Sequence, residues 1–170
     1  MDGSFRIGHL FGIPILIHYT FLLIIPLFAW IIASQIIVTA EMLASLFGIP
    51  VDTTLLSAGF IPWALGVIVA FGLFFGVLVH ELAHSLVARS RGIGINNITL
   101  MIFGGIASME EGSPDSDAEL PMALVGPVAS LIFGLVCCAI VYVIPHAVTD
   151  PPVAGLLIFT VGYLGILNII

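Results

Sequence analysis

Residues 62–90 read PWALGVIVAFGLFFGVLVHELAHSLVARS, an apolar run that ends in two histidines, a glutamate and an arginine. No Asp, Glu, Lys or Arg occurs between Asp52 and Glu81. A helix that spans a bilayer needs roughly 20 mostly apolar residues, so this run predicts a transmembrane helix. Its polar end is unusual, because ionisable side chains within a membrane are costly unless they are paired or have a function.

The whole chain has the composition of a membrane protein. Hydrophobic residues make up 61% of its 170 residues and charged residues only 8%, whereas about a quarter of the residues of a typical soluble domain are charged. Other long uncharged runs precede and follow residues 62–90. We therefore expect an all-α polytopic membrane protein, one membrane-embedded domain over residues 1–170. It would have about four transmembrane helices, near residues 13–39, 62–90, 120–145 and 152–170.

Two features interrupt this helical pattern. Pro26 predicts a kink in the first helix, which membrane helices tolerate. Between Arg91 and Glu110 the chain is uncharged but broken by glycines, so we expect a short strand or a re-entrant segment between the second and third helices. Gly104 and Gly105 within it fit a tight turn as well as they fit a contact with a ligand.

The few basic residues predict the orientation in the membrane. The chain has no lysine, and its arginines are Arg6, Arg89 and Arg91. A hairpin of the first two helices puts all three on one side, which the positive-inside rule makes cytoplasmic. We therefore expect a cytoplasmic N-terminus in the cell membrane. The lack of a basic face excludes a nucleic-acid partner.

His80, Glu81 and His84 form the sequence H-E-x-x-H at the end of the second predicted helix. Residues four apart lie on one face of a helix, so both imidazoles can bind one metal ion, and the motif favours Zn²⁺. Glu81 adjoins the first ligand and could act as general base towards a water molecule at the metal. The alternative is a buried polar cluster that braces helix packing, which we consider the weaker interpretation.

Five segments in this order resemble the site-2 protease family of intramembrane zinc metalloproteases. HELAHSLVAR is similar to the zinc-binding helix of that family. The other segments are Gly12–Phe21, Ile102–Ala107, Leu124–Ser130 and Gly165–Asn168.

The resemblance implies zinc-dependent proteolysis of transmembrane protein substrates within the bilayer. It assigns His80 and His84 as zinc ligands and Glu81 as the catalytic base, with the zinc site towards the cytoplasmic side. It also makes Asn168 a candidate substrate-binding residue. Gly104 and Gly105 could offer backbone hydrogen bonds to an unwound substrate, as in strand addition.

The resemblance also implies a third zinc ligand, an aspartate a few residues beyond Asn168, whereas the sequence ends at Ile170. Catalytic zinc normally has three protein ligands. We expect either a fragment of a longer protease or a catalytically inactive relative that acts as a membrane binding protein. His18 could approach the zinc and support the site or replace the missing ligand; the alternative is an interfacial histidine.

Two further classes of protein contain paired histidines in a helix. A metal transporter is disfavoured, because transport does not require a glutamate next to the first histidine. A metalloprotease with a soluble catalytic domain is disfavoured by the shortage of polar sequence.

Overall fold

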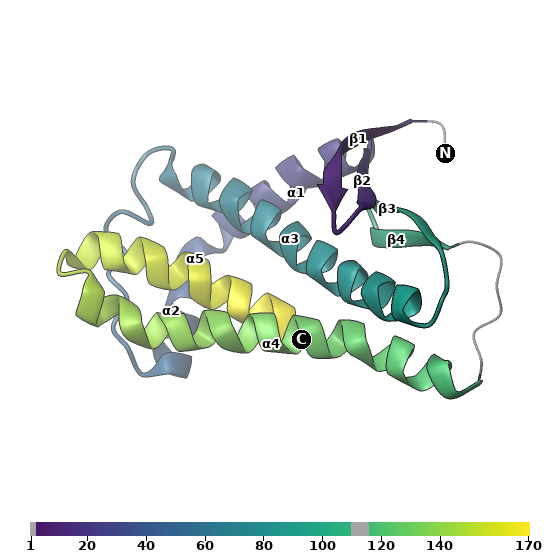
Figure 1. Cartoon of the computed structure of the whole chain (residues 1–170). Helices are drawn as coiled ribbons and strands as arrows, with labels where there is room; N and C mark the ends of the chain where they lie inside the picture. The colour runs from purple at the N-terminus through teal and green to yellow at the C-terminus, as the bar shows by residue number, and fades with distance from the viewer. Residues whose placement is uncertain (1–2, 110–115) are drawn as a thin grey trace. The chain divides into compact units, whose positions relative to one another are not determined.

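The computed structural model describes residues 3–109 and 116–170, with side chains from residue 120 onward in the second range (Figure 1). The chain divides into two compact units. One consists of residues up to Ile24 together with Phe74–Ser130, and the other of Ile25–Leu73 with Leu131–Ile170. The predicted metal motif lies in the first unit.

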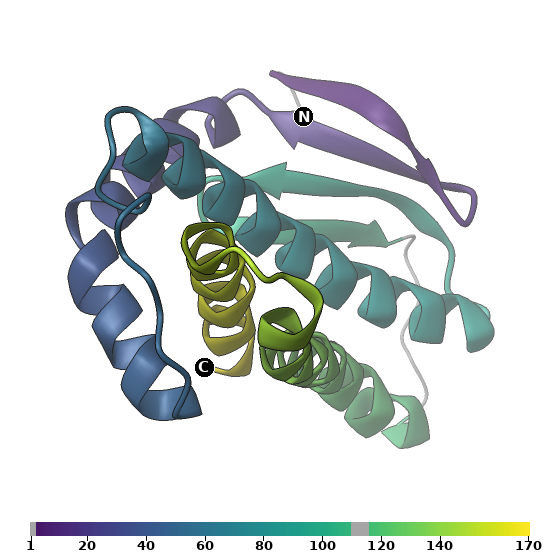
Figure 2. The ribbon, with the colours of Figure 1, turned by 90° about the vertical axis from the view of Figure 1, so that its left-hand side faces the viewer.

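The first unit contains a four-stranded sheet. Its strands are β1 (Ser4–Leu10), β2 (Ile13–His18), β3 (Ile95–Met101) and β4 (Gly104–Met109), in the order β1-β2-β3-β4. β1 and β2 pair antiparallel, β2 and β3 parallel, and β3 and β4 antiparallel. β4 is therefore an edge strand, with a partner on one side only among the described strands (Figure 2).

One face of this sheet packs on helix α3 (Ile61–Ser90). Ile13, Ile15 and Ile98 form a buried cluster, against which Leu78 and Leu82 of α3 pack. Leu78 and Leu82 are four residues apart and so lie on one face of the helix. This contact fixes the histidine-containing part of α3 against the sheet.

The N-terminal hairpin corrects the all-α prediction and the predicted helix near residues 13–39. Residues 13–18 form a strand, and the two residues between β1 and β2, Phe11 and Gly12, both have positive φ angles (51° and 79°). Such a two-residue turn matches the twist of an antiparallel hairpin. Ile13 and Ile15 are buried at alternate positions, as in a strand. The pattern escapes notice in the sequence because the intervening residues are apolar too.

The first helical segment is broken. α1 (Phe21–Ser34) and α2 (Ile36–Phe47) meet at Gln35 with a bend of 68°. The strong bend lies at Gln35 and not at Pro26, which is inside α1. The two helices form either one broken span or a re-entrant loop.

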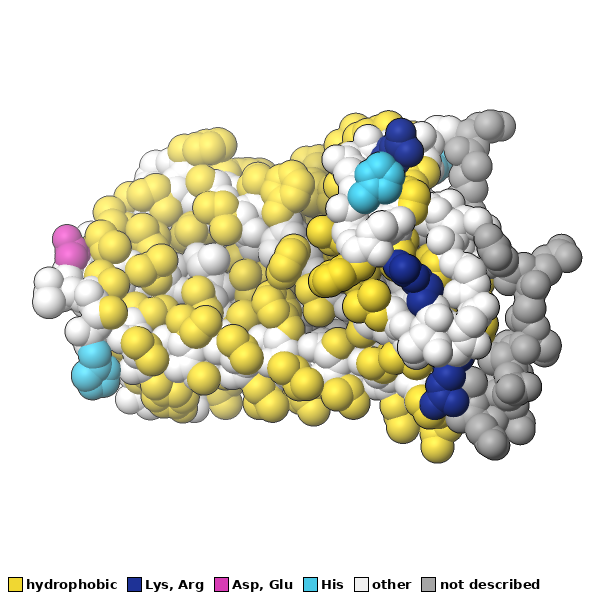
Figure 3. All heavy atoms as spheres, viewed as in Figure 1, with side chains coloured by type: hydrophobic (Ala, Val, Ile, Leu, Met, Phe, Trp, Pro, Cys, Tyr) yellow, Lys and Arg dark blue, Asp and Glu magenta, His cyan; other side chains and the backbone are white. Residues whose placement is uncertain are grey.

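Three further helices are long and apolar enough to cross a membrane, namely α3, α4 (Ser116–Ala147) and α5 (Pro151–Ile169). With the bent pair, the described residues contain three or four candidate spans, in agreement with the predicted number. Many large apolar side chains of α4 are exposed, among them Ile132, Leu135 and Val143. Apolar side chains also cover much of the face shown in Figure 3. Such a surface is stable in lipid rather than in water.

The second unit has its own apolar core. Its largest buried residues include Leu43 of α2, Val69 of α3 and Phe159 of α5. Within this unit α4 and α5 approach closely at glycines. A Cβ at Gly134 would lie only 2.7 Å from the Gly165 carbonyl oxygen, and a Cβ at Gly165 would lie 2.8 Å from Cys138 Sγ. Close contacts at small residues are typical of helix pairs in membranes.

Candidate metal centre

α3 brings the two motif histidines together. His80 and His84 are four residues apart, and their Nε2 atoms are 3.1 Å apart. The rings lie edge to face, with centroids 4.8 Å apart. Both side chains are half-buried. The helix alone thus brings the two nitrogen atoms within reach of a single metal ion, as the four-residue spacing predicts.

The Nδ1 atoms of both rings face α4. His84 Nδ1 donates a hydrogen bond to the Met122 carbonyl oxygen, and His80 Nδ1 is 3.0 Å from Ser130 Oγ. A carbonyl oxygen can only accept, so the proton of a neutral His84 ring is on Nδ1 and the lone pair is on Nε2. The hydrogen bond at one ring nitrogen determines which nitrogen can bind a metal.

The chemistry of this pair fits zinc. Zinc binds imidazole nitrogen at about 2.0–2.1 Å, so two such nitrogens on a tetrahedral ion lie about 3.3–3.4 Å apart. The observed 3.1 Å between the Nε2 atoms is close to that separation. A hydrogen bond between the two rings would also fit this distance. It would not explain, however, why two polar side chains lie in an apolar helix, where they are costly without a function.

The side chain of Glu81 extends from α3 to the edge strand β4. A Cβ at Gly105 would overlap Glu81 Cγ and would lie 3.2 Å from the carboxyl carbon Cδ. Gly105 therefore has to lack a side chain for Glu81 to adopt its position. Glu81 is half-buried, so its carboxylate is partly shielded from solvent beside the histidine pair.

The two neighbouring glycines, Gly104 and Gly105, have different surroundings. Gly104, the first residue of β4 directly after the turn from β3, has a φ of +120° and no atom within 4 Å of a Cβ placed on it. Gly105 contacts Glu81. Substrate binding by either glycine stays a prediction.

The other predicted residues have local partners. His18 Nδ1 is 2.9 Å from Thr20 Oγ1, and its ring contacts that of Tyr19 in a tilted arrangement, with centroids 4.3 Å apart. The Asn168 side-chain amide donates to the Leu164 carbonyl oxygen within α5. The predicted roles of His18 beside the zinc and of Asn168 in substrate binding are untested by these contacts.

A third ligand is not evident among residues 3–109 and 120–170. In that part of the chain, no group of three or more His, Cys, Asp and Glu side chains is placed to hold one ion. The aspartate implied by the resemblance therefore stays a prediction.

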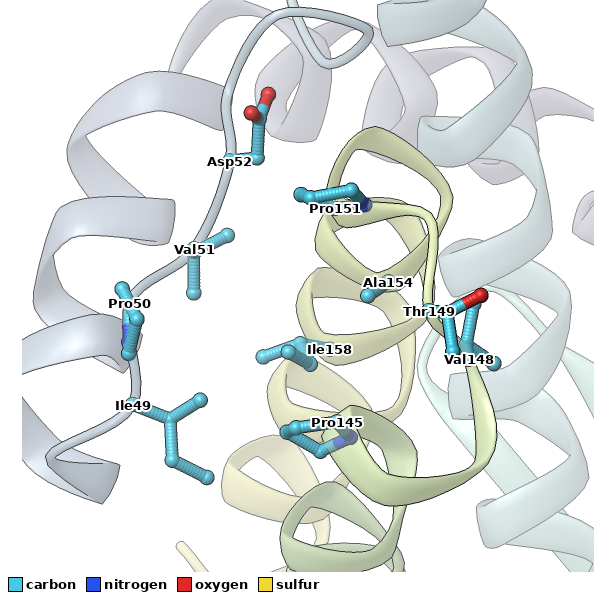
Figure 4. Close-up of a pocket in the computed structure, with 10 residues that line it drawn as sticks. All are labelled: Ile49, Pro50, Val51, Asp52, Pro145, Val148, Thr149, Pro151, Ala154 and Ile158. Carbon is cyan, nitrogen blue, oxygen red and sulfur yellow. The ribbon is translucent and has the colours of Figure 1, made fainter.

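A separate pocket of about 430 Å³ lies in the second unit, between the segment after α2 and the connection of α4 to α5 (Figure 4). Ile49 and Val51 line it on one side and Ile158 on the other. Asp52 is its one carboxylate, and a hydrogen bond from the Thr54 backbone N–H lowers the pKa of Asp52. None of the motif residues lines this pocket.

Sequence reasoning missed the contribution of α4 to the site. The sequence singles out the segment Leu124–Ser130 only through its resemblance to the family. Ser130 and the Met122 carbonyl lie eight residues apart, which is two helical turns. This spacing could have indicated a common face, but nothing in the sequence identifies the helix that the face meets.

Comparisons with known proteins agree with the motif and the fold. The family model for peptidase family M50 matches residues 68–168. A predicted zinc metalloprotease of Synechocystis is 38% identical over 157 residues, which cover 92% of this chain and 38% of the relative. A zinc metalloprotease of Methanocaldococcus jannaschii is 33% identical over 136 residues, covering 80% of this chain and 32% of the relative. The solved site-2 protease from Methanocaldococcus jannaschii is 26% identical and has a TM-score of 0.53, with 95% of this chain and 62% of that chain covered.

The chain thus spans about a third of the length of these curated relatives. The matched region nevertheless includes most of α3 with both histidines, the hairpin of β3 and β4, all of α4 and nearly all of α5. The chain therefore belongs to peptidase family M50, the site-2 protease family of zinc metalloproteases.

Proposed function

We propose that this chain carries part of the catalytic site of a zinc-dependent intramembrane protease, whose substrates are transmembrane proteins. The observation that carries the proposal is the geometry on α3. Two imidazole Nε2 atoms lie 3.1 Å apart, and the Glu81 carboxylate is on the same helix, next to an edge strand. These groups are part of what metal-assisted hydrolysis of a peptide bond requires.

His80 and His84 would hold the ion through Nε2, and the remaining protein ligand would be an aspartate carboxylate. Zinc, when bound, supplies a Lewis acid that acidifies water and polarises a carbonyl group. Glu81 would take a proton from the attacking water and deliver it to the leaving amine. Its half-buried position beside β4 suits this role, because a general base has to lie within hydrogen-bonding reach of the proton it removes.

The edge strand β4 supports a mode of substrate binding. A transmembrane helix hides its carbonyl groups in its own hydrogen bonds, so the substrate has to unwind before cleavage. An unwound segment could add to the free edge of β4, as peptides add to exposed sheet edges. Gly105 contacts Glu81, so a segment paired there would lie close to the catalytic carboxylate. The zinc site would face the cytoplasm.

Removal of the metal tests the proposed function directly. We expect the full-length protein, purified in detergent, to cleave a model single-span membrane protein and to stop when 1,10-phenanthroline strips the metal. One equivalent of zinc should restore cleavage, because the histidine pair supplies a single site. Cleavage that continues in a metal-free preparation would contradict the proposal. A protein that binds zinc but cleaves nothing would favour the inactive binding relative.

A substitution at Gly105 tests how closely β4 and Glu81 depend on each other. We expect Gly105→Ala to lower the cleavage rate about 100-fold, because the new methyl group would displace the Glu81 side chain and a misplacement of about 1 Å is enough for such a loss. Zinc content should stay at the wild-type level, since the histidines are untouched.

Gly8→Ala is the matched control for this change. Gly8 is also a strand glycine, but a Cβ there meets no atom within 4 Å. The control should cleave at the wild-type rate. Equal activity of Gly105→Ala and Gly8→Ala would show that the Glu81 position does not depend on Gly105.

A further inference from the structure

One face of α4 runs along the histidine pair. Met122, Gly126 and Ser130 are four residues apart and so lie on one face of the helix. The Met122 carbonyl oxygen accepts from His84 Nδ1, and Ser130 Oγ lies 3.0 Å from His80 Nδ1. The later histidine on α3, His84, thus contacts the earlier residue on α4, Met122, so the two helices run in opposite directions here. Gly126, midway between the two contacts, faces the space between the imidazole rings.

Gly126 has no room for a side chain. A Cβ at this position would lie 2.6 Å from His80 Nε2 and even closer to His84 Nε2. Nitrogen atoms bind zinc at about 2.0–2.1 Å. The space kept open by the missing side chain is therefore the space into which both Nε2 atoms point.

The backbone at Gly126 does not itself require glycine. Its φ is not among the positive values of the described residues, and glycine inside a helix costs about 1 kcal/mol relative to alanine. A conformational need for glycine is thus excluded. The contact with the two imidazoles remains as the reason why position 126 has no side chain.

We propose that the Met122–Gly126–Ser130 face of α4 positions the metal centre. The hydrogen bonds of Met122 and Ser130 hold the two imidazoles with Nε2 towards a common point, and Gly126 leaves that point open for the ion. The three are positioning residues, because they act through His80 and His84. This inference rests on the proposed function and adds to it a supporting element outside the H-E-x-x-H motif.

Simple helix packing is the competing explanation, and α4 contains a control for it. Gly134 lies two turns further along α4 and approaches the Gly165 carbonyl oxygen, far in sequence from either histidine. Gly126→Ala and Gly134→Ala make the same chemical change at two tight contacts of one helix. Only the former lies against the imidazoles.

The experiment measures zinc affinity of the full-length protein by competition with a chromophoric chelator. It also records the absorption spectrum of the cobalt-substituted form, which reports on ligand geometry. We expect Ser130→Ala to weaken zinc binding about 10–100-fold, the usual effect of removing a hydrogen bond to a ligating histidine, and to change the cobalt spectrum. Ser130→Thr keeps the hydroxyl and should restore both. Gly126→Ala should weaken binding at least about tenfold, and Gly134→Ala should leave the affinity unchanged.

The outcomes separate this inference from the proposed function. Wild-type affinity in both Ser130→Ala and Gly126→Ala would overturn the role of α4, while zinc binding and cleavage by the wild type would leave the proposed function intact. An equal loss in Gly126→Ala and Gly134→Ala, with no effect of Ser130→Ala, would assign the glycines to packing and overturn the inference. A wild-type protein that binds no zinc would overturn both.

Discussion

Glu81→Gln is expected to lower the cleavage rate by about 100- to 10,000-fold, the range that a positioned general base contributes. Glutamine keeps the size and shape of the side chain and so keeps its packing beside Gly105, but it cannot accept the proton of the attacking water. The zinc content should remain at the wild-type level, since neither imidazole changes. This combination of lost rate and retained metal is specific to a catalytic carboxylate.

The measurement is single-turnover cleavage of a model transmembrane substrate, with zinc determined in the same preparation. Glu41→Gln is the matched control, because Glu41 is exposed on α2 and has no part in the proposed site. It should cleave as the wild type does. Equal rates for Glu81→Gln and Glu41→Gln would remove Glu81 from the mechanism.

His84→Ala is expected to weaken zinc binding by about 100- to 1,000-fold and to abolish cleavage at limiting zinc. Apparent binding free energies of roughly 10–16 kcal/mol for zinc held by four ligands correspond to about 3 kcal/mol for each ligand. His84 has a further part, because its Nδ1 bond to the Met122 carbonyl fixes its lone pair on Nε2. Alanine removes the ligand and leaves this carbonyl oxygen without its donor.

Equilibrium dialysis against buffered zinc, with metal analysis of the protein, gives this affinity. His146→Ala serves as control, since His146 is an exposed histidine at the end of α4 whose Nδ1 lies 3.1 Å from the Tyr142 carbonyl oxygen. Its zinc affinity should equal that of the wild type. Unchanged affinity in His84→Ala would exclude the histidine pair as the zinc site.

Sequence reasoning predicts the part of the site that lies within one helix. The spacing of His80 and His84 is enough to bring their rings together, because helical geometry is local and regular. Glu81 follows from its place in the same motif. The contacts made by Ser130 and Gly126 depend on how α4 aligns with α3. The two helices are joined by the segment that contains β3 and β4, and no local pattern in the sequence determines their alignment.

The sequence also predicts some elements of the fold and not others. Long uncharged runs predict α3, α4 and α5, because an apolar segment that crosses lipid has to form the hydrogen bonds of its backbone N–H and C=O groups internally, as a helix does. The sequence predicts helix at Ile13–His18, where the structure has a strand, because an alternating pattern cannot be recognised where residues on both faces of the strand are apolar. The break at Gln35 likewise has no proline or glycine beside it, so the sequence offers no signal for it.

The pairing of β2 with β3 has a consequence for the order of assembly during synthesis. Ile15 lies beside Ile98, and at roughly 5–20 residues per second the ribosome makes the second strand about 4–16 s after the first. The hairpin of β1 and β2 can close within microseconds, but two strands alone are only marginally stable. The edge of β2 that pairs with β3 therefore stays without a partner strand until β3 has been made. The strand β4 beside Glu81 is made later still, so the Glu81 carboxylate acquires its surroundings only after its own helix has been made.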